Sequence, residues 1–176
     1  MNIPAIKSYV TDCPDFPKPG IVFKDITPLL QHPELCAEIV TYMRFQLKGI
    51  QIDAIAGIES RGFLFGMLLA HALQIPFIPI RKAGKLPGKT ISQCYDLEYG
   101  SATIEVQEHA IQKNWNVLIH DDLLATGGTA MATADLILKS GAKVAAFNFL
   151  INLTFLNLDE PLKKYTNHVF AVAEYL

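Results

Sequence analysis

Residues 117–130, VLIHDDLLATGGTA, place an apolar run directly before two carboxylates and a loop of small residues. The run 117–119 is typical of a strand that is buried on both faces, as in a parallel sheet covered by helices. In open α/β folds, ligands bind at the edge where such strands end. We therefore expect Asp121 and Asp122 to lie side by side at the carboxyl edge of a sheet.

The loop after the acidic pair has the composition of an anion-binding turn. Gly127 and Gly128 can adopt backbone angles that are closed to other residues, and successive main-chain N–H groups at a helix start attract anions. Thr126 and Thr129 add hydroxyl groups. Apolar residues then recur at helical spacing until Gly141, which can end a helix. The stretch predicts a strand, an acidic pair, a phosphate-binding loop and a helix.

Length and composition predict one domain over residues 1–176, because 51% of the residues are hydrophobic and 18% are charged. The formal net charge of -2 argues against a nucleic-acid partner, and no run approaches the ~18 apolar residues of a membrane span. The first ten residues lack the pattern of a signal peptide, so we expect a cytoplasmic protein. Three scattered cysteines and five histidines without metal-ligand spacing indicate neither a disulfide framework nor dedicated metal ligands.

Helix and strand patterns alternate along the chain, which is the signature of an α/β sheet. Amphipathic spacing predicts a helix over 33–47, and buried strands are predicted over 53–58 and 76–80. Residues 62–73 are apolar nearly all round, so we expect a fully covered helix there. The predicted fold is a three-layer α/β fold with a mostly parallel central sheet.

Residues 81–100, RKAGKLPGKTISQCYDLEYG, combine basic residues, glycines and tyrosines with weak periodicity. Loops of this length are functional lids or disordered segments. One interpretation is a lid over the acidic pair, and the other is a solvated surface loop. Residues 102–107 alternate apolar and polar side chains, as the returning arm of a hairpin would.

A second polar turn follows a predicted strand in GIESRGFLFG, residues 57–66. The Ser60 hydroxyl and the Arg61 guanidinium can bind phosphate there, the guanidinium bidentately. Two such turns at one sheet edge suit a ligand with two phosphate-bearing ends. The alternative is that Arg61 merely pairs with Glu59.

The proline-rich stretch DFPKPGIVFKDITP, residues 15–28, is expected to be extended and to lie outside the main sheet. Phe23 could stack on a flat ring, and the main chain around Val22 and Lys24 could contact the ring edges. Ordinary packing of an aromatic side chain beside proline is the alternative.

Five motifs in this order resemble the adenine phosphoribosyltransferases over roughly residues 14–156: DFPKPGIVFKDITP, GIESRGFLFG, RKAGKLPGKT, YDLEYG and DDLLATGGTA. DDLLATGGT alone is similar to all type I phosphoribosyltransferases, whereas the proline-rich stretch and GKLPG indicate the adenine branch. The resemblance implies a magnesium-dependent pentosyltransferase of purine salvage. It would transfer the 5-phosphoribosyl group of 5-phosphoribosyl 1-diphosphate to adenine, giving AMP and pyrophosphate.

The resemblance also implies roles for particular residues. The catalytic group comprises Glu98 as acid–base residue, Asp121 and Asp122 facing the ribose hydroxyls, and Arg61. The 5-phosphate loop comprises Ala125, Thr126, Gly127, Gly128 and Thr129. Pyrophosphate would be bound by Ser60, Arg61, Arg81, Lys82 and Lys85, and adenine by Val22, Phe23, Lys24 and Leu153.

Further features follow from the resemblance. They are a homodimer, a hood contributed by about residues 1–30 and the C-terminal part, a flexible lid over about residues 81–100, and a non-prolyl cis peptide joining Glu59 to Ser60. Magnesium would be held mainly by diphosphate and ribose oxygens, because Mg²⁺ keeps several waters. Three positions depart from the family pattern: His120 replaces an apolar strand residue, Lys24 stands where some members have arginine, and Asn152 stands where some have an acidic residue.

Three other functions are alternatives to this one. Preference for another purine would change the hydrogen bonds around the base. A regulator that senses phosphoribosyl diphosphate would need a DNA-binding segment or a basic face, which neither the length nor the charge indicates. A purely structural domain would leave the acidic pair and both phosphate-binding turns unexplained.

Overall fold

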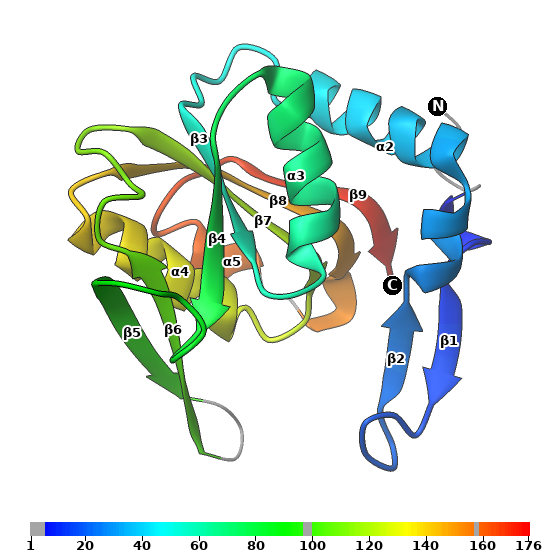
Figure 1. Ribbon diagram of the computed structural model, residues 1–176. Coiled ribbons are helices and arrows are strands. Elements are labelled where there is room, and N and C mark those ends of the chain that lie inside the picture. The colour runs from blue at the N-terminus through cyan, green and yellow to red at the C-terminus, as the bar shows by residue number, and fades with distance from the viewer. Residues whose placement is uncertain (1–5, 97–99, 157–158) are drawn as a thin grey trace.

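A computed structural model describes residues 6–96, 100–156 and 159–176 (Figure 1). Within these residues a seven-stranded sheet has the order β5-β6-β4-β3-β7-β8-β9. Its strands are β3 (Ala54–Ile58), β4 (Phe77–Lys82), β5 (Thr90–Asp96), β6 (Ser101–Gln107), β7 (Asn116–Leu124), β8 (Lys143–Leu153) and β9 (Val169–Tyr175). Strands β4, β3, β7, β8 and β9 run parallel, and β6 is antiparallel to β4 and β5. The predicted mostly parallel sheet is confirmed.

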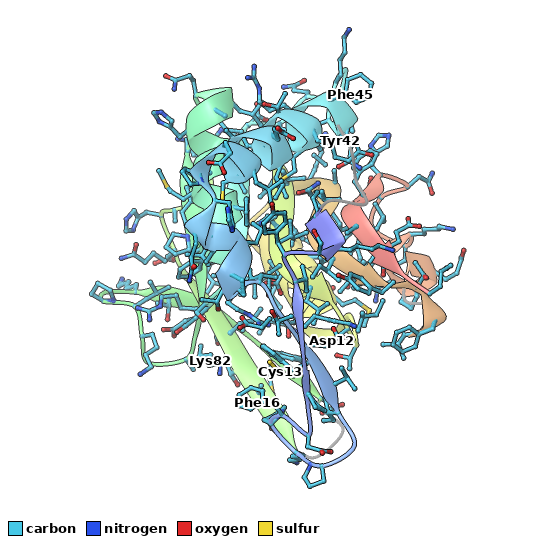
Figure 2. The ribbon with its side chains drawn as sticks, turned by 90° about the vertical axis from the view of Figure 1, so that its right-hand side faces the viewer. Asp12, Cys13, Phe16, Tyr42, Phe45 and Lys82 are labelled. Carbon is cyan, nitrogen blue, oxygen red and sulfur yellow. The ribbon has the colours of Figure 1, made fainter. Side chains whose placement is uncertain are left out.

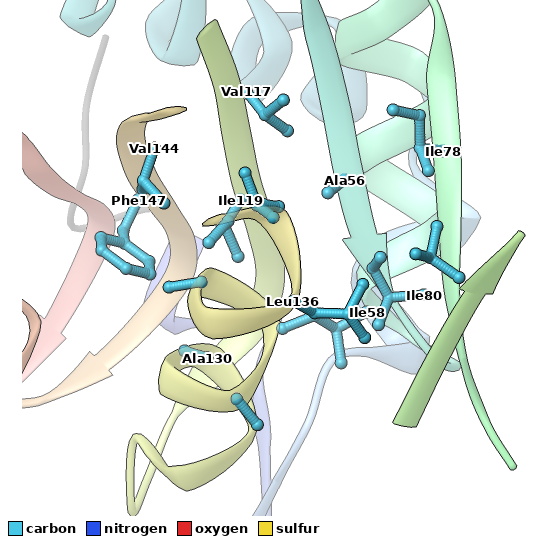
Figure 3. Close-up of a cluster of buried hydrophobic side chains, with 14 of the residues drawn as sticks. Ala56, Ile58, Ile78, Ile80, Val117, Ile119, Ala130, Leu136, Val144 and Phe147 are labelled. Carbon is cyan, nitrogen blue, oxygen red and sulfur yellow. The ribbon is translucent and has the colours of Figure 1, made fainter. Parts of the chain in front are cut away.

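Helices cover both faces of the sheet, giving the expected three layers. On one face lie α2 (Pro33–Gln46) and α3 (Gly62–Leu73), and on the other lie α4 (Gly128–Lys139) and the short α5 (Asp159–Leu162). Each face buries its own apolar cluster. Figure 3 shows the cluster beneath α4, where Ala130 and Leu136 face the strand residues Ile58 and Ile80.

The two helices before the acidic pair begin where their sequences predict, and α2 ends at Gln46, one residue before its predicted end. Helix α2 has Pro33 at its start, where the missing N–H has no helical acceptor, and buries Ile39, Val40 and Met43 on one side. Helix α3 has the predicted bounds, but the expectation that it is fully covered is wrong. Its residues Leu64, Met67 and Leu68 are 40%, 51% and 44% exposed. The sheet covers only one side of a helix, and apolar composition does not specify what covers the other.

The segment 81–100 is more regular than its sequence suggests. Residues 81 and 82 complete β4, and Thr90–Asp96 form β5, which pairs with β6 in the expected hairpin. Cys94 is therefore an exposed strand residue rather than a loop residue. Inward positions of β5 are only half-buried. Its inward and outward side chains therefore differ little in hydrophobicity, and the alternation that marks a strand is weak.

The N-terminal segment forms a separate two-stranded sheet of β1 (Thr11–Pro14) and β2 (Val22–Asp25), as expected for residues outside the main sheet. The 3-10 helix η1 (Thr27–Gln31) joins it to α2, and η2 (Thr154–Leu156) follows β8. Strand β9 lies in the central sheet, and its last residue meets the hairpin, where Lys24 Nζ lies 4.5 Å from the ring centroid of Tyr175.

The β1–β2 hairpin and the β5–β6 ribbon extend beyond the same edge of the molecule, the edge at which β3 and β4 end (Figure 1). The carboxyl edge of the sheet therefore lies between two projecting ribbons. In the described part of the chain, no helix has the length and apolar character required to cross a membrane.

Candidate active site

The acidic pair lies within the last residues of β7, which continues to Leu124, rather than after the strand as expected. Asp122 is buried, Asp121 is half-buried, and the Asp121 Oδ1 atom accepts the Asp122 N–H at 2.9 Å. Burial, followed by the charge of Asp122, raises the pKa of Asp121 well above its usual range. Burial also raises the pKa of Asp122, while the Arg61 guanidinium opposes that rise. Ionisation of both carboxyls thus depends on a nearby cation.

Arg61 is that cation, and it also contacts the hairpin. Its Nε atom lies 2.8 Å from Asp122 Oδ2, and its guanidinium carbon lies 4.4 Å from the ring centroid of Phe23. Asp122 Oδ2 is buried and accepts no aligned hydrogen bond from the described residues. The alternative pairing of Arg61 with Glu59 is therefore wrong, because the guanidinium pairs with Asp122.

Glu59 instead holds the end of β4. Arg81 Nη2 lies 3.1 Å from Glu59 Oε1, and the Lys82 N–H donates to Oε2 at 2.8 Å. The hydrogen bond from Arg81 is the main cause that lowers the pKa of Glu59. The Glu59–Ser60 peptide bond is cis, as expected, and Ser60 is exposed at the turn before α3. The side chains of Lys82 and Lys85 are exposed at the same edge.

The loop between β7 and α4 has the backbone of an anion-binding turn. Gly127 has a φ of 69° and precedes α4, whose start receives no side-chain cap from the described residues. The first helical bond runs from the Met131 N–H to the Gly127 carbonyl at 2.9 Å, which leaves the preceding N–H groups directed out of the helix. The Thr129 hydroxyl donates to the Tyr95 hydroxyl at 3.0 Å, so β5 reaches this loop.

A cavity of about 390 Å³ lies between the hairpin and the turn after β3 and is lined by Cys13, Phe16, Phe23, Asp25, Thr27 and Arg61. Figure 2 shows Cys13 and Phe16 near the projecting end of the hairpin. Hydrogen bonds from the Thr27 side chain and main chain lower the pKa of Asp25. Of the lining residues, only Phe23 and Arg61 were predicted. The others come from the β1–β2 hairpin and from the start of η1, whose places beside Arg61 the sequence did not reveal.

The remaining predicted site residues occupy several places. Val22 is exposed, and Leu153 is buried at the end of β8; neither lines the cavity. The Lys24 side chain is directed to Asp12, with 2.6 Å between Nζ and Oδ1, which leaves only its main chain for a ligand. Glu98 lies outside the described residues.

The described residues contain no group of three or more His, Cys, Asp or Glu side chains arranged to hold a metal ion. On β7 the oxygen donors are the Asp121 and Asp122 carboxylates, of which Asp122 is ion-paired. Such a donor set suits a magnesium ion that brings most of its oxygen ligands with a substrate.

Comparison with known proteins agrees with this geometry. Residues 25–166 match the phosphoribosyl transferase domain family. The adenine phosphoribosyltransferase of Cytophaga hutchinsonii is 51% identical over 170 residues, which cover 97% of this chain and 94% of that protein. The chain belongs to the adenine phosphoribosyltransferases.

Solved adenine phosphoribosyltransferases share the whole fold. The structure from Thermoanaerobacter pseudethanolicus has a TM-score of 0.95 and 41% identity, covering 99% of this chain and 100% of that chain. The enzyme from Saccharomyces cerevisiae, complexed with D-2,5-dideoxy-2,5-imino-altritol 1,6-bisphosphate and adenine, has a TM-score of 0.90 and 39% identity, covering 97% of both chains.

His120, which departs from the adenine phosphoribosyltransferase pattern, is a packed neutral imidazole. It is fully buried on β7, and its Nδ1 atom lies 3.0 Å from the Oδ1 atom of Asn148, its neighbour on β8. Because Oδ1 can only accept, Nδ1 carries the proton. Burial lowers the pKa of His120 to about 4, so the ring adds no charge beside the acidic pair near neutral pH.

This buried imidazole predicts a pH-dependent loss of stability. An unfolded histidine binds a proton below about pH 6.5, whereas folded His120 does so only near pH 4. The contribution of neutral His120 to the free energy of unfolding is fully present above pH 6.5 and is lost as the pH falls towards 4. His120→Gln cannot titrate, so between pH 7 and pH 5 it should lose about 2 kcal/mol less unfolding free energy than the parent. Urea unfolding at both pH values measures this difference, and equal losses in the two proteins would contradict it.

Proposed function

We propose that the protein transfers the 5-phosphoribosyl group of 5-phosphoribosyl 1-diphosphate to adenine, giving AMP and pyrophosphate for purine salvage. The observation that carries this proposal is the position of Arg61, which contacts a buried carboxylate at the sheet edge and the aromatic ring of the hairpin cavity. One side chain thus adjoins both the place proposed for the sugar and the place proposed for a flat base.

The acidic pair is proposed to act on the ribose. Asp121 and Asp122 would accept hydrogen bonds from its hydroxyl groups, and their position at the carboxyl end of β7 supports this assignment. As the bond from the sugar carbon to diphosphate breaks and the bond to adenine nitrogen forms, positive oxocarbenium character develops on the ribose. Fixed negative charge nearby stabilises that transition state.

Both phosphate-bearing ends of the substrate have proposed binding groups. The 5-phosphate would be bound by the loop of Ala125, Thr126, Gly127, Gly128 and Thr129, an assignment supported by the uncapped start of α4. The pyrophosphate would be bound by Ser60, Arg61, Arg81, Lys82 and Lys85. Two of the five N–H groups of Arg81 remain after its bonds to Glu59 and Lys85.

Adenine is proposed to bind beside the hairpin. Phe23 would stack on the ring, the main chain of Val22 and Lys24 would contact its edge, and Leu153 would lie on its other side. Glu98 would take the purine proton as the new bond forms. In the described structure one face of Phe23 carries the Arg61 guanidinium, so stacking on that face requires Arg61 to move towards the diphosphate.

Magnesium is proposed as the cofactor, held mainly by diphosphate and ribose oxygens with Asp121 and Asp122 close by. When bound, it would neutralise charge on the leaving pyrophosphate. We also propose a cytoplasmic location, which suits a chain whose cysteines in the described residues are all free thiols.

A homodimer is proposed to cover the exposed apolar side of α3, formed by Leu64, Met67 and Leu68. Leu68→Lys should weaken self-association by about tenfold or more, because it removes apolar burial and adds a charge. Sedimentation velocity over a range of concentrations measures this effect. Leu138→Lys on α4, at the other face of the sheet, is the matched control with a similarly exposed leucine. Equal association of both variants would place the interface elsewhere.

The proposed reaction is tested by supplying the purified protein with magnesium, phosphoribosyl diphosphate and either adenine, hypoxanthine or guanine. AMP and pyrophosphate from adenine alone would support both reaction and specificity. Turnover of another base alone would overturn the adenine assignment. Tight diphosphate binding without turnover of any base would indicate a sensor.

A further inference from the structure

Glu105 is a buried carboxylate on β6 that binds a neighbouring turn instead of a cation. It is 6% exposed, and its Oε1 atom accepts the main-chain N–H groups of Lys85 and Leu86 at 3.2 and 3.1 Å. Its Oε2 atom accepts the Thr90 hydroxyl at 3.2 Å. No lysine, arginine or histidine among the described residues forms an ion pair with it. These bonds offset the cost of burying a carboxylate.

The bonds of Glu105 form one end of a network that reaches the proposed pyrophosphate turn. The Lys85 peptide is held on both sides, because its N–H donates to Glu105 and its carbonyl accepts Arg81 Nη1 at 3.1 Å. Arg81 in turn donates to both carboxylate oxygens of Glu59, at 3.3 and 3.1 Å. Glu59 directly precedes Ser60, so hydrogen bonds connect β6 to that turn.

We propose that Glu105 is a positioning residue, which fixes the main chain of Lys85 so that its ammonium group is held at the diphosphate end of the substrate. The inference rests on the proposed function, because it takes Lys85 to bind pyrophosphate. Glu105 itself touches no substrate and acts through Lys85.

Two features of the turn explain why it needs this tether. Gly84 and Gly88 flank it with φ of 79° and 80°, and Lys85 between them is exposed. Glycine-rich exposed turns have many accessible conformations, and fixing one during ligand binding costs affinity. A carboxylate that accepts two successive N–H groups fixes the turn before the ligand binds, because such charge-assisted bonds are strong. Less conformational freedom is then lost on binding.

The position of Glu105 also argues against a role limited to sheet stability. Main-chain pairing along the full length of β5 and β6 already holds that ribbon together. Two of the three partners of the Glu105 side chain, Lys85 and Leu86, lie in the turn before β5, and only the third, Thr90, belongs to that strand.

Three single variants test the tether through the Michaelis constants. Glu105→Ala should raise the KM for phosphoribosyl diphosphate by about tenfold and leave the KM for adenine within about twofold. Glu105→Gln keeps a carbonyl oxygen at the Oε1 position and should recover most of that loss. Gln107→Ala is the matched control, because Gln107 lies on the same strand and its side chain donates to the Pro87 carbonyl and not to Lys85 in the described residues.

A double variant separates action through Lys85 from general damage. In a Lys85→Met background the Glu105→Ala change should have little further effect on the diphosphate KM, because the positioned ammonium is already absent. Equal effects in both backgrounds, or a rise in both substrate KM values, would overturn the inference. If Glu105→Ala does not fold, Thr90→Val removes one bond of the tether and should raise the diphosphate KM by roughly threefold, and an unchanged KM would overturn the inference. A parent protein without any turnover would instead refute the proposed function.

Discussion

Asp122→Asn is expected to lower kcat by about 10² to 10³, because it removes fixed negative charge from the place where oxocarbenium character develops. The melting temperature should change by less than about 3 °C. The substitution removes the charge that repels Asp121 at the same time as it removes the partner of Arg61, and these two effects oppose each other. Steady-state kinetics and thermal unfolding of the same preparation measure both quantities.

Asp53→Asn provides the matched control for this substitution. The Asp53 carboxylate accepts the Asn116 N–H at 2.7 Å, at the start of β7 and therefore at the opposite edge of the sheet. Loss of that bonded charge should affect stability but not turnover. Full activity of Asp122→Asn would remove this carboxylate from the proposed mechanism, and an equal loss of activity in both variants would show that the effect is not specific to the site.

Glu98→Gln is expected to lower kcat by about 10² to 10⁴, the usual contribution of general acid–base catalysis. The amide cannot take the purine proton, but it preserves the size and polarity of the side chain. The KM for phosphoribosyl diphosphate should therefore stay close to that of the parent. The pH dependence of kcat tests the same role. The part of the profile that reflects titration of Glu98 in the parent should be absent from the variant.

Glu108→Gln, on an exposed turn after β6, is the control for the loss of one carboxylate charge from the protein. It should behave as the parent does. Unchanged turnover in Glu98→Gln would exclude this carboxyl as the acid–base residue, whereas a raised diphosphate KM with normal kcat would assign it to substrate binding instead.

Local sequence patterns were sufficient for much of the fold. The bounds of α3 match the predicted range 62–73, and the stretch 117–130 folds as a strand, a small-residue loop and a helix. These features depend on periodicity and on residues such as Gly127, whose positive φ a glycine tolerates. Five motifs in a fixed order were also sufficient to identify the family.

The features that the sequence did not reveal depend on which segments meet. The β1–β2 register places Cys13 opposite Phe23 and so creates the cavity wall, yet neither residue predicts the other. The same applies to Arg61, whose partner is Asp122 and not the adjacent Glu59. Glu105 lies in an alternating segment that predicted only a strand, and its role emerged from three contacts with a turn fifteen or more residues away.

The double contact of Arg61 has a thermodynamic consequence for the two substrates. Its guanidinium covers Phe23 while it neutralises Asp122, and a diphosphate that attracts it would uncover the aromatic face. Affinity for the base then depends on whether the sugar diphosphate is present. By linkage, the base must change the affinity for the diphosphate by the same factor. A single arginine can therefore couple the affinities of two adjoining ligand sites, and this coupling requires no movement of the sheet that carries them.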